Sequence, residues 1–116
     1  MNTVNLIGNL ATEVDLRDVS DETKVATFLL AVDRAGPDAG ADFFRITVWN
    51  RQAETCERYL TKGKRVGVEG RLRADSWEDA DGKKRTSVEV VARRVEFLSP
   101  AERAPADEVP FEAAVA

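Results

Sequence analysis

The ten residues A-D-F-F-R-I-T-V-W-N, Ala41 to Asn50, alternate one kind of side chain with another. In a β-strand, successive side chains point to opposite faces. One face of this strand carries Phe44, Ile46 and Val48, an apolar row that suits a protein core. The other face carries Phe43, Arg45, Thr47 and Trp49. The stretch therefore predicts a strand with a buried side and an outer side that combines aromatic rings with a cation.

The outer side of this strand has two readings. The flat rings of Phe43 and Trp49 suit stacking on unpaired bases, with the Arg45 cation meeting the phosphates. Large aromatic residues on an outer face also cover sheet edges or fill interfaces between subunits. The stretch alone does not separate the two.

Composition limits the chemistry that the chain can perform. The chain has 116 residues, enough for one domain with a modest core. It contains no histidine and a single cysteine, which removes the commonest general base, the commonest metal ligand and any intrachain disulfide. We expect a protein that is not an enzyme and holds no metal or cofactor.

The chain shows no sign of a membrane or export segment. No apolar run approaches the ~18 residues of a membrane span, and the N-terminus lacks the pattern of an export signal. We therefore expect a cytoplasmic location.

The net charge of −4 is unevenly distributed. Residues 99–116 hold Arg103 against the carboxylates of Glu102, Asp107, Glu108 and Glu112. Residues 1–98 are therefore close to neutral, and any surface for an anionic partner must come from local clustering of cations.

Four segments lie between the N-terminus and the 41–50 stretch. Residues Thr3 to Leu10 predict a half-buried strand, in which Gly8 marks a bulge or a close backbone approach. Residues 13–22 read as a continuation of that strand into a turn. Residues 24–33 are apolar at both odd and even positions, which predicts a strand covered on both faces. Residues 34–40 are predicted to form a loop.

A change of period after the quoted stretch predicts one short helix, over residues 51–62. Ala53, Cys56 and Leu60 fall on one helical face, and Asn50 and Gly63 suit its two caps. Cys56 reads as a core thiol and not a nucleophile, because no partner base exists in this chain.

The strand-like alternation returns at Arg65. The residues on its outer side continue through Arg71 and Arg73 to Trp77. An Asp81-Gly82 pair then predicts a hairpin turn, and residues 86–98 are predicted to form the last strand. Five strands with one short helix between the third and fourth predict an all-β, Greek-key OB-fold barrel over residues 1–98. Residues 99–116 are rich in Ala, Pro and Glu and are expected to be a disordered acidic tail.

This topology brings three elements to one surface. They are the outer side of the 43–49 strand, the row of Arg65, Arg71 and Arg73, and the hairpin that carries Trp77. Beyond the turn of that hairpin come Lys83, Lys84 and Arg85. Such a groove holds single strands with little sequence preference, since each stacked base contributes roughly 1–3 kcal/mol. Ordinary solvation is the alternative for the arginines and lysines, but it explains an exposed tryptophan less well.

Four motifs carry a resemblance to a known family. They are N-L-I-G-N-L (5–10), F-R-I-T-V-W (44–49), Y-L-T-K-G-K-R-V-G-V-E-G-R-L (59–72) and S-W-E-D-A-D-G-K (76–83). With them, residues 1–98 resemble the bacterial single-stranded DNA-binding proteins. The resemblance implies an OB-fold, sequence-tolerant binding of single-stranded DNA in replication, recombination and repair, and assembly as a homotetramer or, alternatively, a dimer.

The resemblance also implies roles for individual residues. Phe43, Trp49 and Trp77 stand where the family places stacking aromatics, and phosphate-contacting cations correspond to Arg45, Arg51, Lys62 and Arg73. The segment D-E-V-P-F resembles the family's partner-docking tip, which gives Asp107, Glu108, Pro110 and Phe111 as docking residues for replication and repair proteins.

The chain departs from the family pattern at four places. The loop after Val32 lacks an aromatic residue, and Thr3, Asp75 and Ser76 stand where cations are common. The tip does not end the chain, because E-A-A-V-A follows Phe111. We expect weakened phosphate contacts and weak docking. The competing reading is an OB-fold protein-interaction module that binds nucleic acid poorly.

Overall fold

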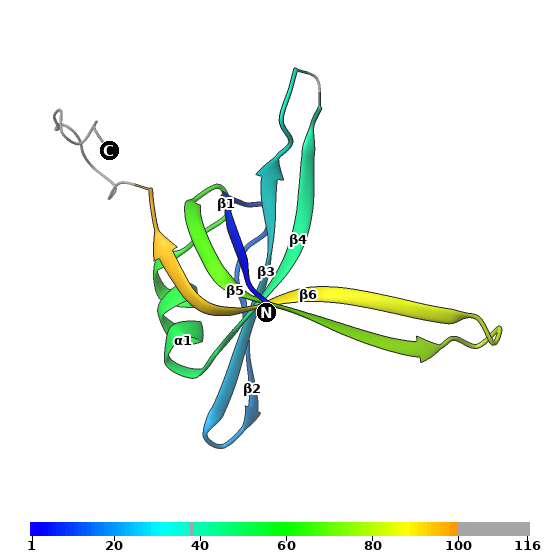
Figure 1. Cartoon of the computed structure of the whole chain (residues 1–116). Helices are drawn as coiled ribbons and strands as arrows, with labels where there is room; N and C mark the ends of the chain where they lie inside the picture. The colour runs from blue at the N-terminus through cyan, green and yellow to red at the C-terminus, as the bar shows by residue number, and fades with distance from the viewer. Residues whose placement is uncertain (38, 100–116) are drawn as a thin grey trace, which may run out of the picture.

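The computed structural model describes residues 1–37 and 39–99, which form six strands and one short helix (Figure 1). In chain order these are β1 (Val4–Leu10), β2 (Asp15–Ser20), β3 (Thr23–Asp33), β4 (Ala41–Trp49), α1 (Asn50–Tyr59), β5 (Arg65–Glu78) and β6 (Lys84–Phe97). The sheet order is β1-β5-β6-β4-β3-β2, and β1 also pairs with β3. That last pairing closes five strands into a barrel, which confirms the predicted all-β OB-fold.

Strand β2 prolongs β1 along β3, as the sequence predicted, but as a strand of its own. Leu10 of β1 lies opposite Leu30, and Asp15 of β2 lies opposite Thr27, so both strands pair antiparallel with β3 and run in the same direction. Residues 11–14 separate the two strands, and β2 pairs with β3 outside the closed ring. The five barrel strands in chain order are thus β1, β3, β4, β5 and β6, and α1 follows the third of them as predicted.

The core lies inside the barrel and beneath α1. It consists of apolar side chains from every element except β2, namely Leu10, Ala26, Phe28, Leu30, Ile46, Val48, Ala53, Cys56, Leu60, Val66, Val68, Val90 and Ala92. Cys56 is only 1% exposed, which confirms that it is a core side chain, and this burial raises the pKa of its thiol to about 11. The prediction that β3 is covered on both sides is wrong at Leu29, whose outer-facing side chain is 37% exposed.

Two glycines allow strands to approach each other closely. A Cβ atom on Gly8 would stand 2.2 Å from the carbonyl oxygen of Ala31, and one on Gly70 would stand 2.2 Å from that of Val91. Gly8 is therefore the close approach that the sequence offered as one alternative. Gly70 lies at a register shift between β5 and β6, where the strands leave regular pairing.

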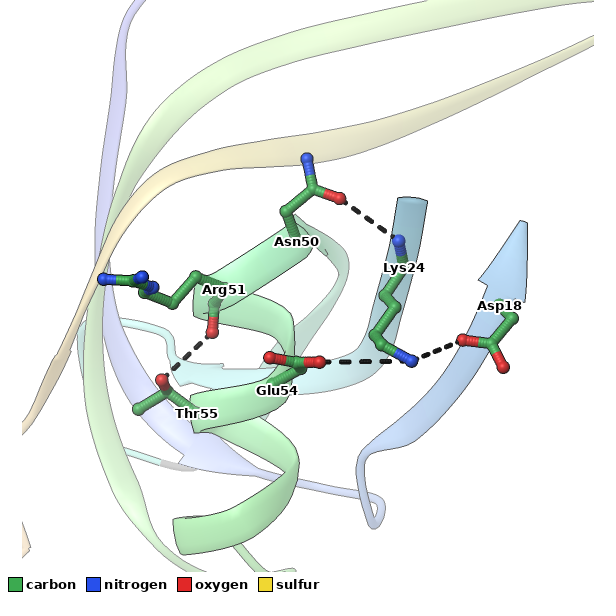
Figure 2. A network of polar contacts seen from close by, with 6 residues as sticks. All are labelled: Asp18, Lys24, Asn50, Arg51, Glu54 and Thr55. Atoms are coloured by element: carbon green, nitrogen blue, oxygen red, sulfur yellow. Dashed lines mark hydrogen bonds and ion pairs between the residues drawn. The ribbon is translucent and has the colours of Figure 1, made fainter. Parts of the chain in front are cut away.

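Both predicted helix caps are wrong. Asn50 is the first residue of α1 and adopts a left-handed backbone with φ of +54°, a conformation that asparagine tolerates better than most residues. Its side-chain oxygen accepts a hydrogen bond from the backbone N–H of Lys24 at 3.2 Å instead of capping the helix (Figure 2). At the other end, α1 stops at Tyr59, and Gly63 lies in the following turn.

The ends of the long hairpins project from the barrel (Figure 1). In β5, residues 65–70 alternate between exposed and buried, whereas residues 71–78 are exposed on both faces. Residues 84–88 of β6 are likewise exposed. The turn falls at Asp81-Gly82 as predicted, with φ of +80° at Gly82. Among the described residues, no helix is long and apolar enough to cross a membrane.

Candidate nucleic-acid interface

Four neighbouring strands build a continuous outer surface, which we call the outer face. Arg45 of β4 lies opposite Leu29 of β3, and Thr47 lies beside Val91 of β6 in the parallel β4–β6 pair. In the β5–β6 hairpin, Arg73 lies opposite Glu89 and Trp77 lies opposite Arg85. The register therefore brings the outer rows of β4, β5 and β6 together.

The aromatic side chains of the outer face are exposed. Phe43 is 61% exposed, Trp49 37% and Trp77 50%, although each is a large apolar ring. Phe44 is half-buried, whereas Ile46 and Val48 are fully buried, so the predicted parity of the 41–50 stretch is confirmed. Large rings left open to solvent on one face are available for stacking.

Thr47 is the exception on this row, because only 4% of it is exposed. Its hydroxyl donates a hydrogen bond to the carboxylate of Glu89 at 2.8 Å, which satisfies the buried hydroxyl. The same carboxylate lies 3.5 Å from Nε of Arg45 and 3.8 Å from Nε of Arg73. The two arginines that the sequence placed on separate strands thus meet at one acidic side chain.

Glu89 is the site residue that sequence reasoning missed. Its side chain is 17% exposed, while those of Arg45 and Arg73 are 63% and 45% exposed. Counting along the two strands from a two-residue turn at Asp81-Gly82 would pair Arg73 with Val90, whereas the observed register pairs it with Glu89. The sequence pattern therefore did not reveal that a carboxylate lies among the cations.

A polar network fixes the position of Trp49 at the end of β4. Val25 of β3 lies opposite Trp49, and the adjacent Lys24 donates its backbone N–H to the Asn50 side chain. The Lys24 ammonium lies 2.6 Å from Asp18 of β2 and 3.9 Å from Glu54 of α1 (Figure 2). The hydrogen bond to Asp18 raises the pKa of Lys24, with Coulomb attraction adding to it. Three elements therefore meet beside the Trp49 backbone.

The hairpin that carries Trp77 is held at its tip by Asp79. Its carboxylate accepts hydrogen bonds from the backbone N–H groups of Asp81 and Lys83, each at 2.9 Å, and from Nε of Arg85 at 2.8 Å. These bonds, the one from Arg85 first, lower the pKa of Asp79. Lys83 and Lys84 stay exposed at the tip, whereas Arg85 is engaged by a carboxylate.

Three predicted cations lie apart from the cluster around Glu89. Arg65 shares the outer parity of β5 with Arg71 and Arg73, as predicted, but it lies at the start of the strand and donates to the side chain of Asn9 at 3.0 Å. Six strand residues separate it from Arg71, roughly 20 Å, so it lies apart from the arginines around Glu89.

The other two, Arg51 and Lys62, flank the barrel at the ends of the helical segment. Arg51 is exposed in the first turn of α1, and its guanidinium points away from Lys24 and Glu54 (Figure 2). Lys62 lies in the turn whose Gly63 N–H donates to the carbonyl of Leu10, at the end of β1. Neither forms an ion pair within the described part of the chain, and Arg71 forms none there either.

Within residues 1–37 and 39–99, no group of three or more Cys, Asp or Glu side chains is arranged to hold a metal ion. The docking residues Asp107, Glu108, Pro110 and Phe111, with nearly all of the expected tail, lie outside the described residues.

A closed five-stranded barrel of this topology is an OB-fold, and an outer face of exposed aromatics and cations is typical of the members that bind nucleic acids. Residues 1–98 match the profile of the Single-strand binding protein family. The chain belongs to that family, which confirms the resemblance drawn from the four motifs.

Curated relatives agree with this assignment. The chain is 43% identical to the single-stranded DNA-binding protein of Bacillus cereus over 104 residues, 86% of this chain and 61% of the relative. It is 44% identical to those of Clostridium tetani and Thermotoga maritima, covering 70% and 79% of their lengths. The chain thus spans about three-fifths of the length of the Bacillus cereus relative.

Proposed function

We propose that this protein binds single-stranded DNA through the outer face, with little preference for sequence. The observation that carries the proposal is that Phe43, Trp49 and Trp77 are all open to solvent on strands whose outer rows adjoin. Three solvent-exposed aromatic rings on one face can stack on unpaired bases, and each stacked base contributes roughly 1–3 kcal/mol. The relatives described above carry the name of this activity.

The cations divide into two groups for this function. Arg45, Arg71 and Arg73 lie within the aromatic surface and would contact the phosphates between stacked bases. Arg51, Lys62, Lys83, Lys84 and Arg85 lie around it and would guide the strand toward and away from it. Because the protein acts by binding, no catalytic group is required, and we assign none.

We further infer that the protein acts as a homotetramer, or else a dimer, that coats single strands exposed in replication, recombination and repair. Its place would be the nucleoid in the cytoplasm. The tail residues Asp107, Glu108, Pro110 and Phe111 would dock partner proteins weakly, because E-A-A-V-A follows the tip. Partner affinity that rises when the chain is cut after Phe111 would support this role, and equal affinity would contradict it.

A protein-interaction module is the second candidate function. It is favoured by the pairing of Arg45, Arg73 and Arg85 with carboxylates, together with the net charge of −4. Paired cations have less charge to offer a phosphate backbone.

A titration of fluorescently labelled oligo-dT, followed by anisotropy, separates the two. We expect saturable binding of oligo-dT at low salt and much weaker binding of a duplex of equal length. Binding should weaken with salt, because cations return to the DNA as the protein leaves it. A protein that binds neither nucleic acid at low salt would be the interaction module.

A further inference from the structure

We propose that Glu89 is an internal counter-ion which single-stranded DNA must displace from Arg45 and Arg73. The inference rests on the proposed function and deepens it, since it names the residue that sets how tightly the outer face holds a strand. It begins from one carboxylate, whose Oε1 lies 3.5 Å from Nε of Arg45 and whose Oε2 lies 3.8 Å from Nε of Arg73. The exposed Asp75 lies 3.6 Å from the same Nε of Arg73, so Glu89 is the carboxylate that the two arginines share.

The carboxylate is held in place more firmly than its partners. One oxygen of Glu89 accepts the hydrogen bond from the buried Thr47 hydroxyl, and β6 is flanked by β4 on one side and β5 on the other. The two guanidinium groups end long, exposed side chains. When a phosphate arrives, the arginines are therefore the groups free to turn, and Glu89 is the group that stays.

The position of Glu89 makes this exchange unavoidable. The residue lies where the β5–β6 hairpin leaves the barrel, between the aromatic surface of β4 and that of the hairpin. A strand that stacks on both Trp49 and Trp77 must pass this point. Each phosphate there meets an arginine that is already partly neutralised, and also a fixed negative charge.

The arrangement has a consequence for binding strength. Part of the attraction between DNA and the two arginines is used to break the existing ion pairs, so binding is weaker than the number of cations implies. Removal of the Glu89 charge should recover that part. The residue thus makes the grip of the outer face reversible without removing any cation from it.

The substitution Glu89→Gln tests this directly, because the amide keeps the size of the side chain and its oxygen still accepts from Thr47. We expect oligo-dT affinity at low salt to rise by about 3- to 30-fold, the range for one removed charge at short distance in partly solvated surroundings. The slope of log affinity against log salt should become steeper. Glu57→Gln, on the exposed side of α1, changes net charge equally and should leave affinity nearly unchanged.

A double-mutant cycle separates displacement from simple repulsion. If DNA displaces Glu89 from Arg45, the substitution Arg45→Ala costs less affinity in the wild type than in the Glu89→Gln background, because the wild-type arginine must first leave its partner. Equal losses in the two backgrounds would contradict displacement, and so would unchanged affinity of Glu89→Gln.

The wild-type protein distinguishes failure of this inference from failure of the proposed function. If it binds oligo-dT and Glu89→Gln binds no better, only the inference falls; if neither protein binds, both fall. Should Glu89→Gln fail to fold, NMR of the arginine side chains in the wild type still decides. The Nε–H signals of Arg45 and Arg73 should both shift at saturating oligo-dT, and unmoved signals would overturn the proposal.

Discussion

The two halves of the β5–β6 hairpin are made of the same pair of strands but lie in different surroundings. We call β5 residues 65–70 with β6 residues 90–97 the barrel half, and residues 71–88 the free half. In the barrel half, Val66, Val68 and Val90 alternate with outer residues and are almost fully buried. In the free half, every residue of the two strands is exposed.

This difference separates what folds the protein from what the protein presents. The barrel half obeys the period-2 rule because one face of each strand packs on the core. The free half keeps the strand geometry without a core, so its Trp77, Arg71 and Arg73 contribute little to folding. The Trp77 ring and the Arg71 guanidinium are open to a ligand, whereas Arg73 is paired with Asp75 and Glu89. Substitutions in the two halves should therefore affect different measurements.

The largest effect is expected in the core beside the barrel half. Ile46→Ala should lower the free energy of unfolding by roughly 2–5 kcal/mol, because the fully buried side chain leaves a cavity. Leu72→Ala in the free half is the matched control. Leu72 is 44% exposed, so its loss should stay below about 1 kcal/mol. Urea denaturation measures both, and equal losses would remove the distinction between the halves.

The junction of the two halves should be the next most sensitive point. Gly70→Ala forces a methyl group against the Val91 carbonyl and should cost about 1–3 kcal/mol of stability. Gly67→Ala, three residues earlier in β5, meets only ordinary contacts, the nearest at 3.7 Å. Thermal melting of the two variants should show a clear loss for Gly70→Ala alone, and a similar melting temperature for both would mean that the backbone yields at the bulge.

In the free half, we expect substitutions to change DNA affinity and leave stability alone. Trp77→Ala should weaken oligo-dT binding by roughly 1–3 kcal/mol, the contribution of one stacked base. Val88→Ala lies on the opposite side of the same hairpin, 55% exposed, and should change neither quantity. A large drop in the unfolding free energy of Trp77→Ala would show that the ring has a structural role instead.

The smallest effect concerns the tip of the free half. The pKa of Asp79 is lowered by its hydrogen bonds to Arg85 and Lys83. The charged carboxylate therefore stabilises the hairpin tip fully above the usual carboxyl pKa of 3.8, and this stabilisation is lost as the pH falls through the lowered pKa. The backbone amide signals of Asp81 and Lys83 should move together in that acidic range. In Asp79→Asn this joint movement should be absent, and a tip that still titrates would assign it to another carboxylate.

The sequence predicted the fold well where patterns are local. The alternation around Ile46, the Asp81-Gly82 turn and the helical face of Cys56 each depend on neighbours along the chain. It failed where a distant contact decides: the Asn50 side chain accepts a hydrogen bond from Lys24 of β3 and does not cap its own helix.

The candidate site was predicted in the same uneven way. The aromatic positions follow from strand parity, which needs only one strand at a time, and Phe43, Trp49 and Trp77 are exposed as expected. The charge balance of the outer face depends on three strands at once. Glu89 was therefore missed.

Single-tryptophan variants test most directly whether the exposed aromatics of β4 and the free half receive the bases. Trp77→Phe leaves Trp49 as the only reporter, Trp49→Phe leaves Trp77, and either phenylalanine retains a ring for stacking. We expect oligo-dT to quench the emission of both variants strongly, with saturation at the same DNA concentration as anisotropy. Unchanged emission from both at full oligo-dT binding would contradict the account, because the strand would then lie elsewhere on the protein.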